Sequence, residues 1–281
     1  MTTGDEIGQL AAAFNRMVVQ LRDNQRVRET FGKYIDPRVA EGLIDRPNLT
    51  AAEGQRRVMS VLSCDMKGFA ALSEGMTPRG LVKVMNRYLS TMSEPIRTNH
   101  GIIDKYIGDS IMAYWGPPFV DEADHARLSC LAALEMIERI PTLRRELLEL
   151  LGVRGTPIES CDLWIGVPTG EALVGSIGSD VMMSYTVMGD VVNLVSRLEG
   201  ANKMYGTRNL VAERTVAASD AAVEVREIDR IEVAGYTHSE VVFEILGRKG
   251  ELTPQQLSSR DRYLEGLAAY RAQRWDDAFR A

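Results

Sequence analysis

The stretch GIIDKYIGDSIMAYWG, residues 101–116, decides how the rest of the chain is interpreted. It predicts two short apolar strands, Ile102 to Ile107 and Ser110 to Tyr114, joined by Gly108-Asp109. Glycine frees the backbone where a chain reverses, so the pattern predicts a β-hairpin with the carboxylate of Asp109 at its tip. An aspartate in a turn usually serves the turn itself, because its side chain can bond the nearby backbone. A chemical role for it therefore needs a second group elsewhere in the chain.

A second carboxylate is found in VMSVLSCDMKGFAALSE, residues 58–74. Here an apolar strand is predicted to end at Asp65, and Gly68-Phe69 follows. A carboxylate at a strand end and another in a nearby hairpin can hold two hard cations between them, because such cations take oxygen ligands. Magnesium usually relies on one or two carboxylates plus substrate phosphates. Asp65 and Asp109 together therefore predict a site for metal and phosphate.

These motifs resemble those of the class III nucleotide cyclases, and the resemblance extends from about Thr30 to Gly247. It implies an α+β catalytic domain with a ferredoxin-like (split βαβ) core. It also implies a lyase that converts ATP to cyclic AMP and pyrophosphate. Asp65 and Asp109 would hold a pair of divalent cations, Mg²⁺ or Mn²⁺, with the Met66 carbonyl as an extra ligand. Phe69 belongs to the substrate-binding residues that the resemblance implies.

Length and composition suit a globular domain with a sizeable core, since 45% of the 281 residues are hydrophobic and 26% are charged. The formal charge of -6 argues against nucleic acid as the main partner. Cys64, Cys130 and Cys161 lie in apolar surroundings without CxxC spacing, which is typical of reduced core cysteines in a cytoplasmic protein. The histidines are scattered singly, so no zinc site is expected. No signal-peptide pattern and no membrane-spanning apolar run is evident.

The first segment, residues 1–28, predicts a coiled-coil helix. Its apolar residues alternate three and four apart: Ile7, Leu10, Phe14, Met17 and Leu21. This spacing favours a parallel two-helix coil, with a plain amphipathic helix as the alternative. DEIG at 5–8 followed by AFN at 13–15 resembles the second helix of a HAMP signalling module. Because such a module usually follows a transmembrane helix, we expect a soluble fragment of a membrane receptor whose catalytic domain lies at the cytoplasmic face.

Three further segments follow the coiled-coil helix. Residues 29–55 predict a transducer helix and a linker, with Asp36 as the cap of a helix that begins at Pro37. Residues 56–248 form the predicted catalytic domain, in which strand, helix, hairpin, helix and strand follow in the order of a split βαβ core. Residues 249–281 predict a helical extension whose pattern resembles the start of a tetratricopeptide-type repeat.

A second motif of the catalytic domain lies within residues 184–206. Gly189-Asp190 predicts the start of a helix on which Asn193 and Arg197, four residues apart, share one face. Such a pair is often simply a solvated face. The resemblance instead implies that Asn193 orients the ribose and that Arg197 stabilises charge on the α-phosphate.

The resemblance identifies Lys105, four residues before Asp109, as the residue that reads the base. A lysine donor can satisfy adenine N1, which is an acceptor, whereas guanine N1 is a donor. Lys105 therefore favours ATP, with a surface lysine as the plainer alternative. The partner position, usually Asp in adenylyl cyclases, is Thr186, whose hydroxyl can still meet the adenine amino group. This threonine resembles the branch of bicarbonate-responsive soluble cyclases, so bicarbonate is a candidate activator.

The resemblance also implies a head-to-tail homodimer with two composite sites. The metal aspartates would come from one protomer, and the base-reading and Asn/Arg residues from its partner.

The chain departs from the family at one position. Ala234, within Val233 to Tyr236, stands where the family usually has a triphosphate-binding lysine. The alternatives to an adenylyl cyclase are a guanylyl cyclase, which Lys105 disfavours, and a catalytically weak dimerising signal module, which Ala234 and Tyr236 would suit.

Overall fold

The computed structural model describes residues 6–32, 35–45, 54–151, 158, 160–232 and 239–280. The chain divides into two units, Met1–Ala51 and Ala52–Ala281. Ala234 and Tyr236 lie outside the described residues. Within the described ranges, no helix has both the length and the apolar content that a membrane crossing requires.

The N-terminal unit contains two helices, α1 (Glu6–Phe31) and α2 (Pro37–Asp45). The predicted helix of the first segment is confirmed, and its seam residues Leu10 and Phe14 are 71% and 59% exposed. An exposed apolar stripe of this kind is what a coiled-coil helix presents to a second helix, although the coiled coil itself stays a prediction. At α2 the backbone N–H of Arg38 donates to Asp36 Oδ1 over 3.0 Å, so Asp36 caps the helix as expected.

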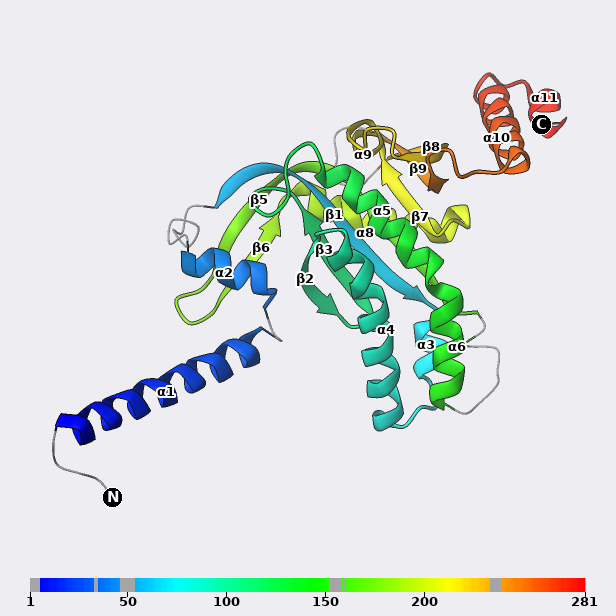
Figure 1. Ribbon diagram of the computed structural model, residues 1–281. Coiled ribbons are helices and arrows are strands. Elements are labelled where there is room, and N and C mark those ends of the chain that lie inside the picture. The colour runs from blue at the N-terminus through cyan, green and yellow to red at the C-terminus, as the bar shows by residue number, and fades with distance from the viewer. Residues whose placement is uncertain are drawn as a thin grey trace. The chain divides into compact units, whose positions relative to one another are not determined.

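The strands of the C-terminal unit lie in one sheet (Figure 1). They are β1 (Gln55–Lys67), β2 (Ile102–Ile107), β3 (Ser110–Trp115), β4 (Asp162–Val167), β5 (Thr169–Gly178), β6 (Met183–Met188), β7 (Asn209–Ala212), β8 (Val223–Glu232) and β9 (Ser239–Arg248). The order is β2-β3-β1-β4-β7-β9-β8, and β5 pairs with β1 and with β6. The four strands β2-β3-β1-β4 pair antiparallel. This is the strand order of a ferredoxin-like core, so the predicted fold class is confirmed.

Helices pack on both faces of this sheet. The helices of the C-terminal unit are α3 (Phe69–Ser73), α4 (Pro78–Thr98), α5 (His125–Glu138), α6 (Ile140–Leu151), α8 (Asp190–Tyr205), α9 (Glu213–Ala218), α10 (Pro254–Arg271) and α11 (Trp275–Arg280), of which α11 contacts α10. Apolar side chains of α4, α5 and α6 pack with those of β1, β3 and β4 in the main core. Leu194 and Leu198 of α8 pack instead with Leu210 and Val242 in a second core. Asp65 of β1 and Glu199 of α8 lie on the α8 side of the sheet.

The formation of α4 follows from its sequence. Thr77 caps it by accepting from the backbone N–H of Gly80 over 3.2 Å, and Pro78 suits the first turn, where no N–H partner is needed. Val84, Tyr88 and Met92 are spaced four apart and are fully buried. This apolar stripe holds α4 on the sheet.

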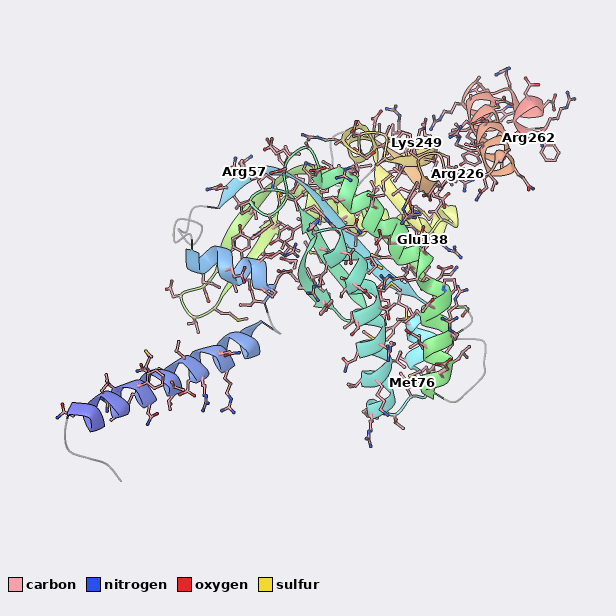
Figure 2. All side chains as sticks on the ribbon, in the orientation of Figure 1. Arg57, Met76, Glu138, Arg226, Lys249 and Arg262 are labelled. Carbon is pink, nitrogen blue, oxygen red and sulfur yellow. The ribbon has the colours of Figure 1, made fainter. Side chains whose placement is uncertain are left out.

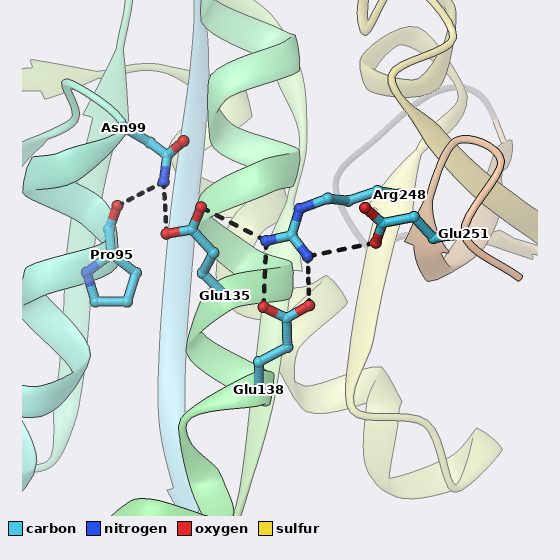
Figure 3. A network of polar contacts seen from close by, with 6 residues as sticks. All are labelled: Pro95, Asn99, Glu135, Glu138, Arg248 and Glu251. Carbon is cyan, nitrogen blue, oxygen red and sulfur yellow. Dashed lines mark hydrogen bonds and ion pairs between the residues drawn. The ribbon is translucent and has the colours of Figure 1, made fainter.

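A polar network joins α4, α5 and the end of β9 (Figure 3). Asn99, which follows α4, donates through Nδ2 to Glu135 Oε2 of α5 over 3.1 Å. The guanidinium of Arg248 lies 3.6 Å from Glu135 and 2.5 Å from Glu138. The end of α4, the helix α5 and the strand β9, which are distant in sequence, are therefore linked through Glu135 and the guanidinium of Arg248.

The C-terminal extension rests on β8. Arg260 of α10 forms an ion pair with Glu224 at 2.7 Å. Arg226, labelled in Figure 2, lies 4.7 Å from the ring centre of Tyr263. The predicted helical extension is found as α10 and α11, whereas the likeness to a tetratricopeptide-type repeat stays a prediction.

Candidate active site

The fold brings Asp65 of β1 and Asp109 of the β2–β3 turn together. The sequence predicts that the strand ends at Asp65, but β1 continues to Lys67, and Asp65 pairs with Trp164 of β4. Side chains alternate along a strand, so Asp65 lies on the face opposite to Cys64 and Met66, which are buried in the main core. A paired strand therefore fixes the direction of this carboxylate more firmly than a strand end would.

Negative charge accumulates around Asp65. Its burial raises its pKa to about 7, together with the charges of Asp109 and Glu199 and a side-chain hydrogen bond with Asp109. The positive charge of Lys203 opposes this rise. A divalent cation would stabilise such a pair of carboxylates, because it offsets their mutual repulsion.

The donor set fits a hard cation. Asp65 and Asp109 offer only oxygen atoms, which suit Mg²⁺ or Mn²⁺. Among the residues that the structure describes, no group of three or more His, Cys, Asp or Glu side chains could hold a metal ion by itself. The remaining ligands would therefore come from substrate phosphates, water or the main chain. The Met66 side chain is 2% exposed and lies in the core, so only its carbonyl could serve.

Glu199 of α8 is a third acidic residue at this site, which the sequence does not predict. Its Oε2 accepts from Ser63 Oγ of β1 over 3.0 Å, and Ser63 Oγ lies 3.2 Å from Ser110 Oγ of β3. Burial raises the pKa of Glu199, while the hydrogen bond from Ser63 and the charge of Lys203 lower it. Glu199 therefore links α8 to the two strands beside the carboxylate pair. The bond joins residues 136 positions apart, so no local pattern could reveal it.

Lys105 and Thr186 lie on strands that contact one another, β2 and β6. The Lys105 side chain is 47% exposed, and its Nζ lies 3.1 Å from Asp104 Oδ2. Thr186 is 8% exposed, and its Oγ1 has no hydrogen-bond partner in the described part of the chain. A buried hydroxyl without a partner costs free energy, which is consistent with a binding role for Thr186.

The other predicted residues lie at separate places. Asn193 and Arg197 are exposed on α8, the helix that carries Glu199 on a different side. Phe69 begins α3 and packs, partly buried, against the main core. One protomer thus displays a carboxylate pair, a Lys/Thr pair and an exposed Asn/Arg pair. These groups could bind cations, a base and a phosphorylated sugar.

Two family models match the sequence. Residues 52–247 match the adenylate and guanylate cyclase catalytic domain, and residues 1–23 match the HAMP domain. The chain is 30% identical over 218 residues to adenylate cyclase 1 of Rhizobium meliloti (strain 1021), which covers 78% of this chain and 32% of that protein. It is 30% identical over 250 residues to an adenylate cyclase of Anabaena cylindrica, covering 86% and 48%. The chain therefore spans between about a third and a half of the length of these relatives.

Solved structures show the same fold. The adenylyl cyclase CyaB from P. aeruginosa is 27% identical, with a TM-score of 0.63, and the match covers 72% of this chain and 100% of that one. The guanylyl cyclase Cya2 is 29% identical, with a TM-score of 0.61, and the match covers 72% and 98%.

Proposed function

The chain belongs to the family of adenylate and guanylate cyclase catalytic domains, and on this premise we propose that it converts ATP to cyclic AMP and pyrophosphate. The observation that carries the proposal is the pair Asp65 and Asp109, which β1 and the β2–β3 turn hold against each other, with Asp65 partly buried. Carboxylates so arranged are suited to the cations that accompany a nucleoside triphosphate.

The proposed reaction joins the ribose 3′-oxygen to the α-phosphorus. The bond from the α-phosphorus to the oxygen of the β-phosphate breaks, pyrophosphate leaves, and the proton of the 3′-hydroxyl passes to solvent. Divalent cations, when bound, would lower the pKa of this hydroxyl and neutralise the triphosphate. Asp65 and Asp109 would hold them. Phosphoryl-type transfer depends mainly on positioning and electrostatics, so Asn193 would orient the ribose and Arg197 would stabilise charge on the α-phosphate.

Base choice rests on Lys105 and Thr186. The half-exposed ammonium of Lys105 can donate to adenine N1, and the buried Thr186 hydroxyl has no partner in the described residues, so it is available to the amino group. A guanylyl cyclase is the second candidate, since the chain is 29% identical to the guanylyl cyclase Cya2. Against it, a lysine donor would face the N1–H of guanine.

The active unit would be a head-to-tail homodimer. Asp65 and Asp109 of one protomer would complete a site with Lys105, Asn193 and Arg197 of the other. The exposure of the Asn/Arg face on α8 supports this, because those side chains are free to reach a second chain. The match of residues 1–23 to the HAMP domain supports a role as the output part of a membrane signalling receptor. Bicarbonate is a proposed activator, on the likeness at Thr186 alone.

The test is to incubate the purified protein separately with ATP and with GTP, in the presence of Mg²⁺ or Mn²⁺, and to identify the products. We expect cyclic AMP and pyrophosphate from ATP and much less cyclic GMP from GTP. Equal or faster turnover of GTP would make the guanylyl cyclase the better assignment. A flat response to bicarbonate at fixed pH and ionic strength would remove it as an activator.

A further inference from the structure

Strand β2 carries a bulge immediately before Lys105. Ile103 pairs with Ala113 of β3, and the next pair is Lys105 with Met112, so Asp104 is the extra residue. In a bulge, two successive side chains oppose a single partner residue instead of alternating regularly. The alternation of a regular strand would separate Asp104 from Lys105, whereas the bulge lets Asp104 Oδ2 lie 3.1 Å from the Lys105 ammonium.

The Asp104 carboxylate is buried in an unusual way. Its side chain is 1% exposed, against 47% for Lys105. In the described residues neither Oδ1 nor Oδ2 has a hydrogen-bond partner, so its contact with Lys105 is one of charge without hydrogen-bond geometry. Burying a carboxylate without hydrogen bonds costs folding free energy, so an aspartate is not expected at this strand position unless it has a function.

The surroundings of Asp104 point to a ligand. Thr186 Oγ1 also lacks a hydrogen-bond partner within the described ranges, and β6, which carries it, contacts β2. Two polar groups with spare hydrogen-bonding capacity therefore lie on two strands that contact one another without pairing, β2 and β6, and the lysine ammonium lies beside one of these groups. A flexible lysine loses rotamer entropy when it is fixed for binding, and a buried anion that holds it beforehand reduces this cost.

We propose that Asp104 is a positioning residue for base recognition, which holds the Lys105 ammonium so that it points at N1 of the purine. The inference rests on the proposed function of Lys105. When Asp104 holds the ammonium, Lys105 donates to adenine N1 and repels the N1–H of guanine. Without Asp104, both the hydrogen bond to adenine and the repulsion of guanine are weaker. Asp104 thus sharpens the preference for ATP over GTP without touching the reacting atoms.

The experiment compares the wild-type chain with Asp104→Asn, Lys105→Met and the double variant. Asp104→Asn keeps the size of the side chain and removes its charge. We expect it to raise the KM for ATP about three- to tenfold, with a smaller change in kcat, and to narrow the ratio of kcat/KM for ATP and GTP by a similar factor. In the Lys105→Met background, the same substitution should have no further effect, because Asp104 acts through Lys105.

An additive loss in the double variant, or an unchanged KM and preference in Asp104→Asn, would overturn the proposal. Circular dichroism and the dimer fraction check folding, and Asp104→Glu, which retains the charge, should recover part of the preference. Asp277→Asn removes an exposed partner of Arg274 and is the matched control, with unchanged kinetics.

Binding of 3′-deoxy-ATP and 3′-deoxy-GTP, followed by calorimetry, repeats the comparison without turnover. The two proposals can then fail separately. A wild-type preference for ATP that Lys105→Met abolishes but Asp104→Asn leaves intact defeats only the inference about Asp104. A wild-type chain without preference for the adenine nucleotide defeats the assignment of Lys105 and, with it, this inference.

Discussion

At the scale of single residues, the candidate site depends on charges held where water screens them poorly. Asp65 lies on a paired strand, two residues before the strand ends, and its pKa is raised to about 7 by burial and by its acidic neighbours. Such placement costs folding free energy, and it fixes the position of Asp65, a proposed oxygen ligand of the cations, on a strand.

Neutralising either proposed metal ligand, Asp65 or Asp109, should greatly reduce turnover. Asp65→Asn and Asp109→Asn keep the shape of the side chain, but each removes a charged ligand of the cations. We expect each to lower kcat by about a hundredfold or more, since both cations contribute to stabilising the transition state. Initial rates of cyclic AMP formation at saturating ATP measure this. Near-normal turnover in either variant would contradict the assignment of the metal site.

His125 should contribute to the pH dependence of stability. It is 3% exposed, its Nδ1 lies 2.8 Å from Ser60 Oγ, and burial lowers its pKa from the ordinary 6.5, with Glu122 opposing this shift and Arg214 adding to it. A group whose pKa is lower in the folded chain contributes stability above its unfolded pKa. That stability is lost as the pH falls below about 6.5 towards the folded value.

We therefore expect His125→Asn to destabilise the protein by about 1–2 kcal/mol near neutral pH, through lost packing. The difference from wild type should narrow towards about pH 5, because the variant has no imidazole to protonate. Urea unfolding at both pH values measures it. If the difference in unfolding free energy is the same at both pH values, the pKa of His125 does not differ between the folded and unfolded states.

Individual residues also show where sequence reasoning succeeds. The hairpin around Asp109 was predictable, because Gly108 and two apolar runs define it locally. The bulge at Asp104 was not predictable, since it depends on the pairing register of β2 and β3. Glu199 was not, because its bond to Ser63 joins distant segments. The sequence therefore predicts features that depend on adjacent residues, such as the hairpin. Residues such as Asp104 and Glu199, whose surroundings depend on strand pairing or on distant segments, can be recognised only in the folded structure.

At the scale of elements, the position of α8 depends on a close approach to β4. A Cβ added to Gly166 would lie 2.4 Å from the Val195 carbonyl oxygen and 2.6 Å from the Glu199 nitrogen, both in the α8 backbone. Backbone atoms cannot rotate away as a side chain can, so only glycine permits this distance. The contact sets the depth at which α8 presents Asn193 and Arg197.

Gly166→Ala should therefore displace α8 and lower the free energy of unfolding by about 1–3 kcal/mol, the typical cost of overpacking a core. Activity should fall even where the variant remains folded, because Asn193 and Arg197 move with the helix. Gly200→Ala is the control on α8 itself, since an added Cβ there meets nothing within 4 Å. Thermal unfolding and cyclic AMP formation measure both variants; equal behaviour of the two would mean that the approach of α8 to β4 is not constrained.

Arg248 should stabilise the packing of α5 against β9. It is 30% exposed and pairs with Glu135, Glu138 and Glu251, so removing it leaves several carboxylates near one another (Figure 3). We expect Arg248→Met, which keeps the apolar stem, to cost about 1–2 kcal/mol, more than an isolated surface pair. Arg274→Met, which breaks one exposed pair with Asp277, should cost less than about 0.5 kcal/mol. Urea unfolding compares them, and equal costs would reduce the network to an ordinary surface pair.

At the scale of the whole molecule, each proposed composite site is built from residues of two chains. α8 carries Glu199 beside the carboxylate pair of its own chain and exposes Asn193 and Arg197 elsewhere. The sequence indicated both Asp65 and Asp109 and the pair Asn193 and Arg197, but its periodicity could not show whether the two pairs serve the same site or different sites. That assignment came from the family resemblance and is open to direct test.

The test mixes two inactive homodimers. Asp65→Ala removes a metal ligand, and Arg197→Ala removes the charge at the α-phosphate, so each alone should be nearly inactive. After subunit exchange, a heterodimer has one site with both defects and one with neither. Random exchange of equal amounts makes about half of the dimers heterodimers with one working site of two, so activity should return to about a quarter of wild type. Mixing Asp65→Ala with Asp109→Ala is the matched control and should restore nothing, because both defects belong to the same half-site. If the first mixture stays inactive while mass spectrometry shows exchange, each site is built within a single chain.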